Sequence, residues 1–61
     1  MIEKMIEIIN EEIEIAVKYF EIRKENDWIA LSKIRGMIEM LEIASGKEYE
    51  FDENGVFEKH I

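Results

Sequence analysis

Between residues 2 and 24, apolar side chains recur in alternating steps of three and four. This period places them on one face of an α-helix. A second apolar row runs beside the first and is interrupted once, by Glu12. Because no glycine or proline falls in this stretch, an unbroken helix is predicted over about residues 2–24. The first row consists of Ile2, Ile6, Ile9, Ile13, Ala16 and Phe20, and the second of Met1, Met5, Ile8, Ile15, Tyr19 and Ile22.

The helical period stops at residues 25–27 and then resumes. Asn26 or Asp27 can accept hydrogen bonds from the free N–H groups at the start of a new helix. Gly46 follows the last periodic residue, and glycine readily takes the left-handed conformation that closes helices. A second helix is therefore predicted over about 27–45, antiparallel to the first because the connection is short. Its main row is Leu31, Ile34, Ile38 and Leu41, and a further row of Ile29, Met40 and Ile43 surrounds Gly36.

After the second helix the apolar period changes to two, which is typical of β-strands. The run Asp52-Glu53-Asn54-Gly55 has the composition of a tight turn. We therefore predict a short β-hairpin over about residues 47–61. An isolated hairpin is marginally stable in water, so its aromatic face is expected to pack on the helices or on another subunit.

The register of this hairpin depends on the turn. A type I turn with a bulge at Gly55 pairs Phe51 with Phe57 and Tyr49 with Lys59, whereas a two-residue Asn-Gly loop sets the aromatic residues of the first strand opposite polar ones. The bulged register is favoured because it gathers the apolar side chains. It places on one face Tyr49, Phe51, Phe57 and Ile61.

The predicted fold is thus mainly α with some β: a single small domain of an antiparallel two-helix hairpin followed by a β-hairpin. The apolar arc of each helix is too wide for one neighbouring helix to cover. Mid-helix Gly36 also indicates a close approach by another helix or ring. We therefore expect a homodimer with a four-helix core. The residues predicted for that core are Ile6, Ile9, Ile13, Phe20, Ile34, Ile38 and Leu41.

The amino-acid composition excludes several classes of function. The 61 residues include 15 acidic and 8 basic side chains, for a net charge of −7, and no cysteine. The charge opposes nonspecific binding to nucleic acid or to an anionic membrane. The lack of cysteine excludes a disulfide framework and a thiolate nucleophile. Without a membrane-spanning run or a signal peptide, a cytoplasmic protein is expected.

Candidate catalytic and metal-binding chemistry is sparse. His60 has no cysteine companion and no Glu-x-x-His arrangement around it, so it is expected to be a solvated strand residue rather than a metal ligand. Neither of the two serines, Ser32 and Ser45, has a base at a recognisable spacing. We therefore expect no enzymatic activity, no cofactor and no metal.

Two features point instead to a protein partner. Trp28 near the start of the second helix has the side chain most enriched at interface hot spots, although it can equally cover the turn between the helices. The second feature is an acidic strip of like charges that fits either a solvated helix face or a docking surface for a basic partner. The strip consists of Glu3, Glu7, Glu11 and Glu14.

These observations favour a small, acidic, non-catalytic protein-interaction module that inhibits or adapts another protein. In size and acidity it resembles the small inhibitors that phages and mobile elements encode. Two alternatives stay open: a purely structural, self-assembling helical domain, and a nucleic-acid mimic that blocks a basic DNA- or RNA-binding protein.

Overall fold

The computed structural model describes residues 1–20 and 28–60, without the side chains of Tyr19, Phe20 and Trp28. Helix α1 spans Ile2–Ile15 and continues as a π-helical turn, η1, over Ala16–Phe20. Helix α2 spans Trp28–Ser45, and strands β1 (Tyr49–Asp52) and β2 (Gly55–Glu58) form an antiparallel pair. The predicted order of two helices followed by a two-stranded sheet is confirmed.

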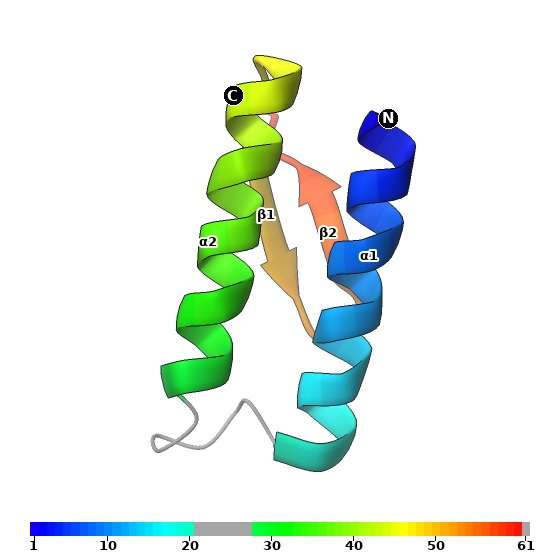
Figure 1. Cartoon of the computed structure of the whole chain (residues 1–61), viewed down its shortest axis with the longest axis vertical. Coiled ribbons are helices and arrows are strands. Elements are labelled where there is room, and N and C mark those ends of the chain that lie inside the picture. The colour runs from blue at the N-terminus through cyan, green and yellow to red at the C-terminus, as the bar shows by residue number, and fades with distance from the viewer. Residues whose placement is uncertain (21–27, 61) are drawn as a thin grey trace.

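The molecule has two layers. The helices lie side by side and antiparallel, and the hairpin lies across one side of the pair, with β1 behind α2 and β2 behind α1 (Figure 1). The core fills the space between the layers, and no polar side chain among the described residues is buried there. The buried side chains are Ile9, Ile13, Ala16, Ile34, Ile38, Leu41 and Tyr49.

The first helix departs from regular α-geometry after Ile15. The apolar row that faces the core continues from α1 to Ala16, which is 3% exposed and is the first residue of the wider π-helical turn. A regular α-helix was predicted through this segment, and its sequence contains no glycine or proline that would signal the change. The remainder of that prediction, residues 21–24, lies outside the described residues.

The second helix ends as its sequence predicts. Gly46 has a φ of 72°, and its N–H donates to the carbonyl oxygen of Glu42 at 2.8 Å. The left-handed conformation satisfies one of the last free carbonyl groups of the helix. At mid-helix, a Cβ added at Gly36 would meet nothing within 4 Å in this chain, and a close approach by a helix of another copy stays a prediction. No close neighbour from the chain itself explains this glycine.

The predicted register of the β-hairpin is wrong. Phe51 lies opposite Val56 and Tyr49 opposite Glu58, so neither the bulged register nor the Asn-Gly loop occurs. The connection is the two-residue loop between Asp52 and Gly55, which face each other. Val56 therefore takes the place predicted for Phe57 on the core side. Phe57 lies on the far face and is 47% exposed.

Side chains from the helices fix this register. The N–H of Val56 donates to Oδ1 of Asn10 on α1 at 2.8 Å, and the N–H of Tyr49 donates to Oε2 of Glu42 on α2 at 3.0 Å. Lys59 N–H donates to the Glu48 carbonyl, so in this antiparallel pattern residues 49 and 56 turn their N–H groups away from the partner strand. Each helix thus caps the outer edge of the strand beneath it.

Candidate protein-interaction face

No helix or strand of the described residues lies over the side of the helix pair that faces away from the hairpin (Figure 1). Large apolar side chains lie exposed along it: Ile29, Met40 and Ile43 of α2 are 67%, 65% and 80% exposed. Ile8 and Ile15 of α1 are exposed as well. We call this side the open face, and define it by Met1, Met5, Ile8, Glu12 and Ile15 of α1 and Ile29, Lys33, Gly36, Met40 and Ile43 of α2.

These ten positions form two seams. Within each helix they follow one another in steps of four, three, four and three residues. That spacing is the a/d pattern of helices that pack against further helices in a bundle. Each helix therefore carries two apolar rows, one facing the core and one on the open face.

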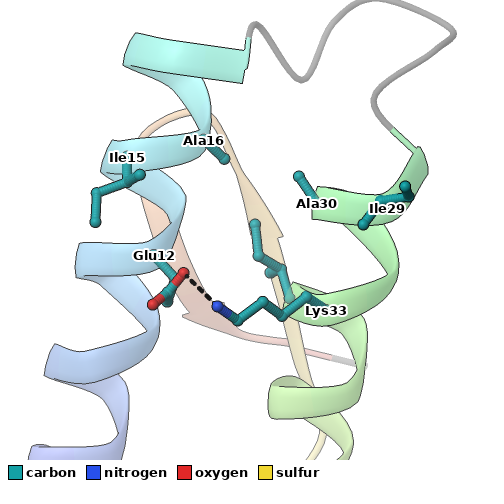
Figure 2. Close-up of a pocket in the computed structure, with 7 residues that line it drawn as sticks. Glu12, Ile15, Ala16, Ile29, Ala30 and Lys33 are labelled. Atoms are coloured by element: carbon teal, nitrogen blue, oxygen red, sulfur yellow. Dashed lines mark ion pairs between the residues drawn. The ribbon is translucent and has the colours of Figure 1, made fainter.

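Two apolar hollows lie between the seams. One, of about 180 Å³, is lined entirely by apolar residues: Met5, Ile8, Ile9, Met37 and Met40. The other, of about 200 Å³, lies nearer the η1 end of the pair and is drawn in Figure 2. It is lined by Glu12, Ile15, Ala16, Ile29, Ala30, Lys33 and Ile34.

Each seam contains one charged residue, and the two charges meet. Nζ of Lys33 lies 3.2 Å from Oε2 of Glu12, so the pair joins α1 and α2 between the two seams (Figure 2). The Lys33 side chain is 63% exposed and the Glu12 side chain 31% exposed. An ion pair with this much solvent contact contributes about 0–1 kcal/mol to the stability of one chain. It also leaves the open face without net charge.

Five of the seven residues predicted for the dimer core are buried inside the single chain. Ile9, Ile13, Ile34 and Leu41 are at most 2% exposed, and Ile38 is buried beside them. Ile6 is partly buried at the edge of this core, and the Phe20 side chain lies outside the described residues. These side chains join the helices to the hairpin. The apolar surplus on the surface comes instead from the second row of each helix.

The acidic strip is solvated. Glu3, Glu7, Glu11 and Glu14 are all exposed on α1. By helical spacing, Glu3 and Glu7 point away from the open face, whereas Glu11 and Glu14 border Ile15 and line a hollow with it. The strip therefore lies on a different part of α1 from most of the open face and adjoins it at Ile15. Trp28 was also predicted to contact a partner, but its side chain lies outside the described residues.

Other site chemistry is not assembled in the described part of the chain. No group of three or more His, Cys, Asp or Glu side chains there is arranged to hold a metal ion. His60 is exposed just beyond β2. Of the helices that the structure describes, none combines the length and apolarity needed to cross a membrane.

Comparison with known proteins adds no relative. The chain gives no significant match to a protein-family model, to a curated protein or to a solved structure. Functional inference therefore rests on the physical character of the open face and of the acidic strip.

Proposed function

We propose that this chain is a small non-catalytic protein-interaction module that works as a homodimer and docks, as an inhibitor or adaptor, on a basic surface of another protein. Two copies pack open face against open face and form a four-helix core. The observation that carries the proposal is the pair of exposed apolar seams. Monomeric proteins rarely leave such a contiguous apolar surface in water.

The size of the open face suits a dimer. The Cα atoms span 31 × 22 × 17 Å, and the open face lies across the two longer dimensions (Figure 1). Such an outline is comparable to the roughly 800 Å² that each partner contributes to a standard interface. Burial of a fully exposed aliphatic side chain stabilises by about 1.5–3 kcal/mol. The five exposed side chains of each copy, which are 43–80% exposed, would gain part of this value toward the cost of association.

The charge distribution assigns dimerisation to the open face and docking on a basic partner to the acidic strip. Glu12 and Lys33 neutralise each other, so this pair adds no net repulsion between two copies that meet at the open face. Glu3 and Glu7 of the acidic strip point away from the open face and stay available after dimerisation. A dimer displays two such strips, and their like charge is complementary to lysine- and arginine-rich surfaces.

The homodimer is tested by light scattering on purified protein over a range of concentrations. Met40→Lys places a charge in a seam and is expected to convert the dimer to a monomer. Phe57→Lys is the matched control, because Phe57 is an exposed apolar residue on the far face of the hairpin. It should leave the dimer intact. A wild-type chain that stays monomeric at all concentrations would overturn the homodimer.

The docking role is tested by capture from the native cell. Glu7→Gln with Glu14→Gln removes two charges of the strip, and Glu39→Gln with Glu48→Gln removes two exposed charges elsewhere. We expect one protein in defined ratio with the wild type and with the second variant, and its loss with the first. Capture of nothing but the chain itself would favour a purely structural dimer. Release of the partner by DNA would identify nucleic-acid mimicry.

A further inference from the structure

We infer that the homodimer has one particular orientation, in which α1 of each copy lies on α2 of the other and Glu12 meets the partner's Lys33. This inference rests on the homodimer proposed above and adds how the two copies recognise each other. It follows from the position of the ion pair within the open face.

Symmetry allows two principal arrangements. When the same face of two copies meets, the two-fold axis must lie in the plane between them. If the axis runs along the helices, α1 of one copy covers α2 of the other, and residues at one level along the helices stay at that level. If the axis runs across the helices at the level of the ion pair, α1 covers α1, α2 covers α2, and the ends exchange levels.

The ion pair distinguishes these arrangements. Because Glu12 and Lys33 are 3.2 Å apart, they lie at the same level on neighbouring helices. With the axis along the helices, each carboxylate faces an ammonium group of the other copy, and the four charges alternate. With the axis across the helices, carboxylate faces carboxylate and ammonium faces ammonium. Like charges in direct opposition at an interface oppose association, so the first arrangement is favoured.

The apolar contacts agree with the same axis. Ile8 and Met40 line one hollow, and Ile15 and Ile29 line the other. An axis along the helices places each hollow opposite the same hollow of the other chain. An exposed side chain of α1 then meets an exposed side chain of the partner's α2. Between the hollows, a Cβ on Gly36 would have nothing within 4 Å, so the backbone of this residue is open to a close approach.

Charge reversal tests whether the pair lies in the interface. Glu12→Lys alone and Lys33→Glu alone each give four like charges at the contact, and both homodimers are expected to weaken. Mixing these two variants, one of them labelled with ¹⁵N, should give heterodimers in native mass spectrometry well above the one-half expected from random pairing. Random pairing in that mixture, with a dimeric wild type, would place the ion pair outside the interface and overturn the inference while leaving the homodimer standing.

A second mixture tests the axis. The double reversal, Glu12→Lys with Lys33→Glu, keeps opposite charges face to face and should dimerise like the wild type. If α1 lies on α2, a heterodimer of this variant with the wild type places like charges opposite each other. The fraction of heterodimers should therefore fall below one-half. A rise above one-half would indicate the crossed axis and contradict the inference.

Cross-linking gives the same answer without altering a charge. The chain contains no cysteine, so each introduced thiol is unique. A mixture of Ile8→Cys and Met40→Cys chains should form a mixed disulfide between copies. A mixture of Ile8→Cys and Ile15→Cys chains should not, and efficient cross-linking of that second pair would establish the opposite orientation.

Discussion

At the scale of single residues, Asn10 and Gly55 together hold the hairpin against the first helix. Asn10 accepts a hydrogen bond from Val56, and a Cβ on Gly55 would lie 2.8 Å from the same Asn10 oxygen. Gly55 also has a φ of 130°, a conformation that residues with a side chain rarely adopt. Steric room and backbone conformation therefore both require glycine here.

Gly55→Ala should lower the free energy of unfolding by about 1–3 kcal/mol, because it strains the backbone and displaces Asn10. Gly36→Ala is the matched control. That site is helical and open, so alanine should raise the free energy of unfolding by up to about 1 kcal/mol. Urea unfolding in the Met40→Lys background measures both without self-association. Equal effects of the two substitutions would contradict the role given to Asn10.

At the scale of elements, local sequence determines the helices and non-local contacts determine the hairpin register. The three-and-four spacing and the glycine at the end of α2 predict two helices because both signals lie within a few residues. The register depends on Asn10, which is 46 residues before Val56 in the chain. The sequence around the turn carries no sign of that contact. A register chosen to place the aromatic residues on one face was therefore wrong.

In the candidate site, too, some features follow from local sequence and others from contacts between distant residues. Both apolar rows of each helix are visible in the sequence, but which row the hairpin covers is decided by the packing of three elements together. Glu12 appears in the sequence as an interruption of the second row and Lys33 as an isolated base. Only the antiparallel alignment of α1 and α2 brings them within 3.2 Å.

The hairpin is expected to be essential to the fold of the helices. It covers one side of the core, with Tyr49 buried and Phe51 and Val56 packed against the same cluster. A chain ending at Gly46 exposes this side of the core to water, so cooperative thermal unfolding by circular dichroism should be lost. A chain ending at His60 retains both strands and should unfold like the full chain. Cooperative unfolding of the shorter chain at an unchanged temperature would show that the helices fold without the hairpin.

At the scale of the whole molecule, the two sides of the helix pair differ in what covers them. One side is covered by the chain's own hairpin, and the other exposes two seams whose single charges neutralise each other. A chain of 61 residues has a small core, so a second layer of helices would add substantially to its stability. The same sequence pattern thus builds the core on one face and, in the proposed dimer, the contact between copies on the other.

The capped strand edges limit how a molecule with so much exposed apolar surface can associate. A two-stranded sheet has two outer edges, and strands of other chains can add to such edges one after another and grow into fibrils. Here the carboxylate of Glu42 and the amide of Asn10 already occupy backbone N–H groups on those edges. The capped edges thus oppose open-ended strand addition, whereas in the proposed dimer the helical faces of two copies pair and leave none exposed for a third copy.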